Sequence, residues 1–136
     1  MTRGRFTESD VEEAALEWLG QLGWTVRYGP DIAPGGCHAE RTDYHDPLLS
    51  GRLEAAIARL NPGASVEARE EALRQVTRVG APSLVQANRA FHHLLVNGVE
   101  AEVVRDGETR GELIRLVDFD EPANNDLLAV NQYTIV

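Results

Sequence analysis

One stretch of the chain collects side chains that bind metals in other proteins. Cys37 and His38 are adjacent, His45 and Asp46 are adjacent, and Asp43 lies between the two pairs. Structural zinc sites use paired arms such as Cys-x2–4-Cys, and the spacing Cys-His-x6-His-Asp matches none of these patterns. The sequence therefore favours a polar surface loop over a zinc site, and the roles of Cys37, His38 and His45 stay open.

The basic residues exclude several kinds of chemistry, because all thirteen are arginine and the sequence contains no lysine. A Schiff-base lysine and the lysine of a phosphate-binding P-loop are therefore excluded within these residues. No Gly-x-Ser-x-Gly elbow is present either, so a serine hydrolase of that type has no support. Any chemistry that needs a lysine cannot be complete in this sequence.

Composition bounds the class of protein. The 136 residues are 43% hydrophobic and carry a net charge of −9, which predicts a single globular domain over 1–136 with a real core. The charge has the wrong sign for a free-standing nucleic-acid binder. Cys37 is the one cysteine, so there is no internal disulfide, which fits a reducing cytoplasm. No apolar run approaches the roughly 18 to 20 residues of a membrane span.

Local signals predict a helix, a strand, a loop, three further helices and three further strands. Thr7 or Ser9 can cap the first helix, with Asp10 or Glu12 three residues on, and Gly23 ends it. Asp106-Gly107 supplies the turn of a β-hairpin. The expected elements are a helix over 8–22, a strand over 24–28, a loop over 29–47, a helical block over 48–97, and strands over 99–104, 111–117 and 127–136.

The sequence also predicts how the first helix and the last strand are covered. Helical spacing in the first helix predicts a buried stripe made by Val11, Ala15, Trp18 or Leu19, and Leu22. The final strand has no turn or charged tail after it. We therefore expect the chain to be the front piece of a longer polypeptide, cut inside or beside a sheet. An open strand edge favours pairing between copies, so self-association of the fragment is a further expectation.

Four stretches, each weak alone, are fairly specific in their succession. The first is 6–19 with its Leu22-Gly-Trp24 ending, and the second is Glu40-Arg-Thr-Asp-Tyr-His-Asp46. The third is 53–62, and the fourth is Leu116-Val-Asp-Phe-Asp-Glu-Pro-Ala-Asn-Asn-Asp126 leading into Val130-Asn-Gln-Tyr-Thr-Ile135. Together they resemble the N-terminal domain of the restriction (R) subunit of type I restriction–modification enzymes.

The resemblance implies a mixed α/β (α+β) fold of the PD-(D/E)-x-K nuclease type. The first helix would pack on an incomplete mixed sheet, and the helical block would be an insertion. In such proteins the next segment carries Arg-Pro-Asp and then Glu-x-Lys, whose two acids and lysine gather Mg²⁺ for DNA cleavage. This sequence stops before those motifs, so the fragment alone is expected to be inactive. The full-length protein would use Mg²⁺ and ATP, and its partners would be DNA and the modification and specificity subunits.

The family analogy also nominates individual residues. A glutamate of the first helix often lies beside the metal in family nucleases, which points to Glu12 and, second, to Glu8. Both could instead be solvated acids that complement the helix dipole. Arg41 and Arg52, with Arg59, become candidates for DNA contact. The alternative is that the arginines of this region form i,i+4 pairs with glutamates on exposed faces.

A non-enzymatic reading competes with the nuclease reading. An acidic α/β domain could dock a protein partner on its helical block and complete its last strand by β-augmentation. The charge of −9 and the lack of a complete catalytic set favour this rival slightly.

Overall fold

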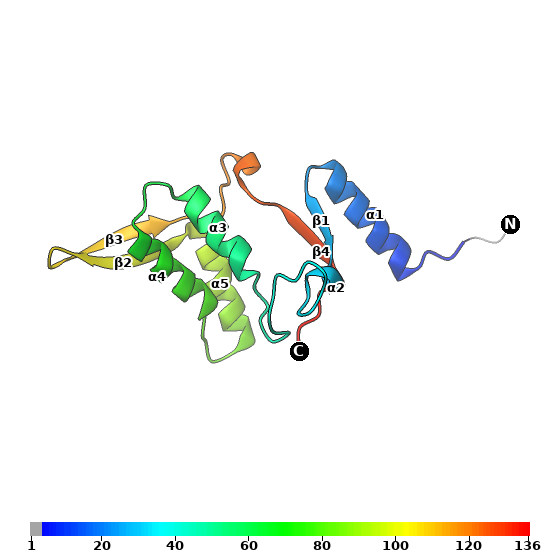
Figure 1. Ribbon diagram of the computed structural model, residues 1–136, viewed down its shortest axis with the longest axis horizontal. Helices are drawn as coiled ribbons and strands as arrows, with labels where there is room; N and C mark the ends of the chain where they lie inside the picture. Colours follow the sequence, from blue (N-terminus) through cyan, green and yellow to red (C-terminus); the bar gives the residue numbers. More distant parts are fainter. Residues whose placement is uncertain (1–3) are drawn as a thin grey trace. The chain divides into compact units, whose positions relative to one another are not determined.

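A computed structural model describes residues 4–136, and its contacts divide this part of the chain into two compact units. The first unit comprises the described residues up to Leu49 together with Asp126–Val136, and the second is Ser50–Asn125 (Figure 1). Whether the chain behaves as one domain stays a prediction that this division does not test. No helix within residues 4–136 is long and apolar enough to cross a membrane.

The first unit begins with helix α1 (Glu8–Gln21), whose start is fixed by a capping box. The N–H of Asp10 donates to Thr7 Oγ1 at 3.3 Å, and the N–H of Thr7 donates to Asp10 Oδ2 at 2.8 Å. Two donors that a helix start leaves unpaired are satisfied in this way. Thr7 is therefore the cap, and Gly23, with φ +96°, follows the helix end. The observed bounds agree closely with the predicted helix.

A short parallel ladder forms the rest of the first unit. Strand β1 (Thr25–Tyr28) pairs with β4 (Leu128–Asn131), with Thr25 opposite Leu128 and Tyr28 opposite Asn131. Between β1 and the long loop lies a single-turn helix, α2 (Gly29–Ile32), in a stretch that was predicted to be loop. The predicted last strand is wrong beyond Asn131, because Gln132 has φ +51° and turns the chain out of the ladder.

Helix α1 lies against this ladder, but not through the predicted face. Val11, Trp18 and Leu22 are 62%, 66% and 76% exposed, whereas Leu16 and Leu19 are half-buried. The predicted stripe is therefore wrong except for Leu19. The physical reason is that two strands of four residues each cover only one narrow face of a four-turn helix.

The second unit contains three helices, as predicted: α3 (Ser50–Leu60), α4 (Val66–Thr77) and α5 (Leu84–Asn97). Serine hydroxyls cap two of them, since Ser65 Oγ accepts from Ala68 N and Ser83 Oγ accepts from Gln86 N, each at 3.2 Å. A 3-10 turn, η1 (Pro122–Asn124), follows later in the unit.

The predicted hairpin is present, with shifted bounds. Strand β2 (Val99–Arg105) pairs antiparallel with β3 (Glu108–Ile114), so the second strand starts and ends three residues earlier than predicted. Asp106 and Gly107 have φ of +51° and +79°, which is the positive-φ turn that two-residue hairpins favour.

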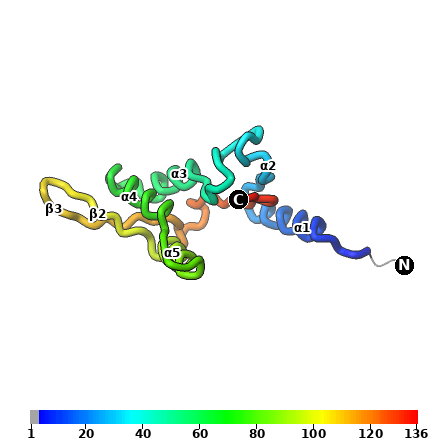
Figure 2. The backbone as a smooth tube through the Cα atoms, turned by 90° about the horizontal axis from the view of Figure 1, so that it is seen from below, coloured from blue at the N-terminus to red at the C-terminus, as the bar shows by residue number. Residues whose placement is uncertain are grey.

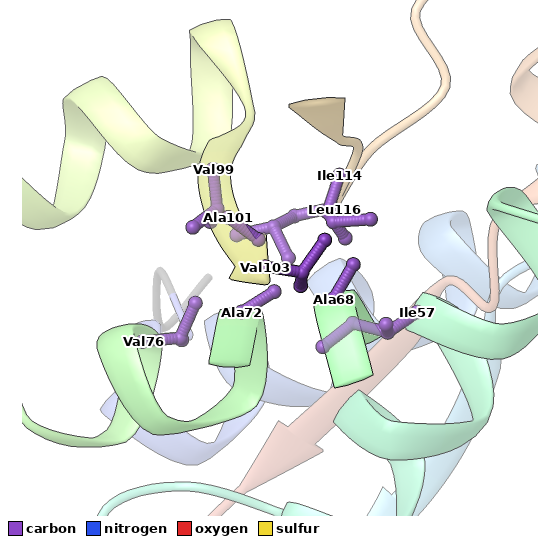
Figure 3. Packing of buried hydrophobic residues seen from close by; sticks show 9 residues of the cluster. All are labelled: Ile57, Ala68, Ala72, Val76, Val99, Ala101, Val103, Ile114 and Leu116. Atoms are coloured by element: carbon purple, nitrogen blue, oxygen red, sulfur yellow. The ribbon is translucent and has the colours of Figure 1, made fainter. Parts of the chain in front are cut away.

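The core of the second unit lies between the hairpin and α4 (Figure 3). Alternate residues of β2 point toward α4, whose two small alanines let the helix approach the strand closely. The buried cluster comprises Ile57, Ala68, Ala72, Val76, Val99, Ala101, Val103, Ile114 and Leu116.

The described strands form two separate two-stranded sheets, one in each unit. The mixed α/β class is therefore confirmed, but the expected single mixed sheet is wrong for residues 4–136. Hairpin residues pair with each other, and β1 pairs with β4 alone. The first helix lies on the smaller, parallel sheet.

Candidate functional site

The carboxyl ends of β1 and β4 bring together residues from both ends of the chain. Glu12, half-buried on α1, accepts hydrogen bonds from Gln132 Nε2 at 3.1 Å to Oε1 and 3.3 Å to Oε2. Gln132 follows β4 directly, at the point where its positive φ turns the chain. In open α/β sheets, ligands bind outside the carboxyl ends of parallel strands. Glu12 and Gln132 therefore form the candidate site of the first unit.

Gly29 explains how the strand ends approach so closely. A Cβ atom on residue 29 would overlap the carbonyl oxygens of Gln132 and Asn131. A side chain at this position would therefore push the end of β4 away from the end of β1. Only glycine leaves room for this approach.

Sequence reasoning nominated Glu12 but missed Gln132. Gln132 was expected inside the strand predicted over 127–136, whereas β4 ends at Asn131, so no local signal in the sequence marked it. Glu8 is exposed in the first turn of α1, where a carboxylate complements the helix dipole. The metal roles of Glu12 and Glu8 stay predictions.

The long loop does not assemble the metal ligands that its sequence contains. His45 Nδ1 lies 2.8 Å from Asp43 Oδ1, and both side chains are well exposed. Hydrogen bonds from the backbone N–H and the ring of His45 lower the pKa of Asp43. Cys37 is an exposed free cysteine. Across residues 4–136, no group of three or more His, Cys, Asp or Glu side chains is placed to hold a metal ion.

Arg41, nominated for DNA contact, is one of the most buried side chains of the first unit at 3% exposure. It donates to two backbone carbonyl oxygens, of Asp46 at 3.0 Å and of Thr134 at 2.9 Å. Its guanidinium carbon lies 4.0 Å from the centroid of the Tyr133 ring. These contacts tie the loop to the end of the described chain, a region that Figure 2 shows from below.

The other nominated arginines lie on α3 in the second unit. Arg52 is half-buried in the first turn, and Arg59 is exposed, with Nε donating to the Asn124 carbonyl oxygen at 2.8 Å. On α4, Arg74 pairs with Glu71 at 2.6 Å in an i,i+3 relation, so this arginine fits the expectation of glutamate pairing at a slightly different spacing. DNA contact by Arg41, Arg52 or Arg59 stays a prediction.

Comparisons with known proteins assign the chain to a family. The sequence model described as the type I restriction enzyme R protein N terminus matches residues 5–136. The type I restriction enzyme HindI endonuclease subunit of Haemophilus influenzae is 35% identical over 128 residues. A putative type I restriction enzyme MjaIXP endonuclease subunit of Methanocaldococcus jannaschii is 30% identical over 125 residues.

The coverage of these alignments is very uneven. They span 94% and 92% of this chain but 12% of each relative, so the chain corresponds to about an eighth of their length. No solved structure matches the chain significantly, and the nuclease-like fold therefore stays a prediction. The resemblance seen in the sequence is confirmed: the chain belongs to the type I restriction enzyme R protein N-terminus family.

Proposed function

We propose that this chain forms the N-terminal part of the nuclease domain in the R subunit of a type I restriction endonuclease. The observation that carries the proposal is the family match over residues 5–136, with relatives named as endonuclease subunits. The longer protein would cleave DNA with Mg²⁺ after ATP-driven translocation. Its partners would be DNA and the modification and specificity subunits.

The geometry of the first unit also supports this assignment. A carboxylate, Glu12, lies at the carboxyl end of a parallel strand pair, where such a site is expected. Mg²⁺ binds one or two carboxylates together with water and substrate oxygens. We propose that Glu12 contributes to a metal site completed by residues outside this chain.

The residues present do not complete a site for either cofactor. Within the described range, no group of three or more metal-binding side chains converges. The sequence has no lysine for a P-loop. We therefore propose that this chain is inactive by itself.

Two measurements test the proposal. In the gene that encodes this chain, the codons after Val136 should specify Arg-Pro-Asp and then Glu-x-Lys. The purified 136-residue chain should leave supercoiled plasmid intact in Mg²⁺, and so should the Glu12→Gln variant. Cleavage by the chain that disappears in Glu12→Gln would show that its own residues suffice, contrary to the proposal.

A second candidate is the non-enzymatic interaction module, with the docking face on α1 instead of the helical block over 48–97. Val11, Trp18 and Leu22 expose an apolar face on α1, and exposed apolar patches often mark interaction sites. The net charge of −9 agrees with this candidate. A stop codon, or an unrelated linker, after Val136 would favour the module over the nuclease.

A further inference from the structure

We propose that Arg41 is a positioning residue that holds the chain beyond β4 in place, so that Gln132 is kept against Glu12. The stretch that it fixes, residues 132–136, is termed the exit segment. Any bearing of this arrangement on DNA cleavage rests on the proposed nuclease function. The contacts of Arg41 and the exit segment lie within the first unit.

The guanidinium of Arg41 bridges two backbone segments that are distant in sequence. Nη1 donates to the Asp46 carbonyl oxygen at 3.0 Å, and Nη2 donates to the Thr134 carbonyl oxygen at 2.9 Å. Two parallel donors on a rigid plane can satisfy both carbonyls at once. At 3% exposure, these bonds are shielded from competition by water, and bonds from a charged donor are worth more than neutral ones.

Aromatic rings flank the same guanidinium. Its carbon lies 4.0 Å from the centroid of the Tyr133 ring and 5.7 Å from that of Tyr44. Arginine is attracted to ring faces at such distances. The Tyr133 hydroxyl donates to the Pro47 carbonyl oxygen at 2.9 Å. Burial raises the pKa of Tyr133, and the positive charge of Arg41 partly opposes this rise.

The exit segment is also held at its two ends. The N–H of Val136 donates to the Tyr44 carbonyl oxygen at 3.1 Å. At the other end, the backbone of Gln132 abuts Gly29, where no side chain would fit. Residues 132–136 are thus confined between the long loop and the end of β1.

This confinement explains the backbone of Gln132. A φ of +51° is uncommon for a residue with a side chain, and such conformations persist where the surroundings determine them. Tyr133 and Thr134 are fixed by Arg41, so Gln132 cannot relax to an extended conformation without breaking those contacts. The same conformation directs its amide to both oxygens of Glu12. Arg41 therefore acts on Glu12 through Gln132.

Lysine substitution separates this inference from a general need for positive charge. An ammonium group retains the charge but lacks the planar fork, so it cannot reproduce the two-carbonyl bridge and the ring stacking together. The test compares Arg41→Lys and Arg41→Met. Arg59→Lys is the matched control, because Arg59 also donates to a backbone carbonyl but lies in the second unit.

The readouts are NMR signals of the 136-residue chain. Backbone chemical shifts of Gln132 report its positive φ, and its side-chain amide signals report the contact with Glu12. In Arg41→Lys and Arg41→Met, we expect the positive-φ pattern to be lost and the amide signals to move to values typical of a glutamine that makes no hydrogen bond to a carboxylate. Signals of Ala129 in β4 should remain in Arg41→Lys, and Arg59→Lys should change none of these signals.

Three results would overturn the inference. Retention of both Gln132 signatures in Arg41→Met would show that Arg41 does not position the exit segment. Retention in Arg41→Lys with loss in Arg41→Met would show that charge alone suffices. If Arg41→Met unfolds the first unit, Arg41→Lys decides: unchanged Gln132 signals there contradict the proposal. Because no readout uses DNA or Mg²⁺, failure here is distinguishable from failure of the proposed function.

Discussion

Asn61 and Arg115 are joined by two reciprocal hydrogen bonds between a side-chain amide and a backbone unit. Asn61 Nδ2 donates to the Arg115 carbonyl oxygen, and the Arg115 N–H donates to Asn61 Oδ1, both at 2.8 Å. Nδ2 also donates to the Ile57 carbonyl oxygen at 2.8 Å. One buried amide therefore closes the end of α3 and anchors the chain beyond β3.

Replacement of Asn61 should weaken the second unit. We expect Asn61→Ala to lower the free energy of unfolding by about 1–3 kcal/mol, because it leaves backbone groups unpaired in a buried place. Urea unfolding followed by circular dichroism measures this loss. Asn61→Asp keeps the acceptor for Arg115 but sets a carboxylate against two carbonyl oxygens. The loss of stability in Asn61→Asp should become smaller as pH falls and the carboxylate is protonated. If Asn61→Asp is as stable as wild type at neutral pH, the two hydrogen bonds from Nδ2 do not stabilise the unit.

Glu112 should stabilise the folded chain at neutral pH, where its carboxylate is ionised, and should lose this effect in acid. Hydrogen bonds from the Ser65 hydroxyl at 2.6 Å and from the Ser65 N–H at 3.2 Å lower the pKa of Glu112. A carboxyl whose pKa is lower in the folded state stabilises the fold above its ordinary pKa, and this contribution is lost as pH falls through the lowered value. Glu112→Gln should therefore destabilise the chain at neutral pH and progressively less in acid.

The matched control for this prediction is Glu102→Gln, which alters an exposed glutamate on the other strand of the same hairpin. Urea unfolding at several pH values compares the two variants. A loss of stability that is the same at every pH, or equal in both variants, would show that the Ser65 contacts do not set the acid dependence.

Gly29→Ala should destabilise the first unit, because the added methyl would overlap the backbone at the end of β4. Overpacking of this kind costs about 1–3 kcal/mol. Gly20→Ala in α1 is the control within the same unit, since a methyl group added there would meet only Val26 Cγ2 at 3.7 Å and alanine favours a helix by up to about 1 kcal/mol. Both tryptophans, Trp18 and Trp24, belong to the first unit, so their fluorescence follows the unfolding of that unit. Equal stability of Gly29→Ala and wild type would contradict the tight approach.

Gln132 offers a test of backbone strain. Gln132→Ala and Gln132→Gly both lose the contact with Glu12, but only glycine adopts φ +51° without steric cost. Gln132→Gly should therefore unfold at a higher urea concentration than Gln132→Ala. We expect its free energy of unfolding to be larger by about 1 kcal/mol. Tryptophan fluorescence follows the transition. The reverse order would indicate that the positive φ is not imposed by the surroundings in solution.

Features set by local chemistry were predictable from the sequence. The Asp106-Gly107 turn and the start of α1 at Thr7 depend on residues within one or two turns of the chain. Their side-chain and backbone preferences act before any tertiary contact forms. The type and order of the longer elements were therefore predictable, whereas the short α2 and η1 were missed, β3 is displaced by three residues, and β4 ends five residues before its predicted end.

Features set by distant partners were not predictable. Which face of α1 is buried depends on how wide the neighbouring sheet is, and apolar spacing at Trp18 carries no such information. The burial of Arg41 depends on the distant Thr134 carbonyl. Gln132 has a positive φ although it is not a glycine, so its residue type does not predict this conformation. Glu12 was nominated by family analogy, but its partner Gln132 became visible only when the two ends of the chain were placed together.

The pairing of β1 with β4 delays the folding of the first unit until late in the translation of this sequence. Thr25 leaves the ribosome early, yet its neighbour Leu128 is translated near the end of this sequence. The middle of the chain, Ser50–Asn125, carries its own packed interior and can collapse while translation continues, since local contacts form faster than distant ones. Helix α1 and strand β1 therefore lack their contacts with β4 until that strand emerges, and during this interval the unpaired edge of β1 is open to chaperones or to wrong neighbours.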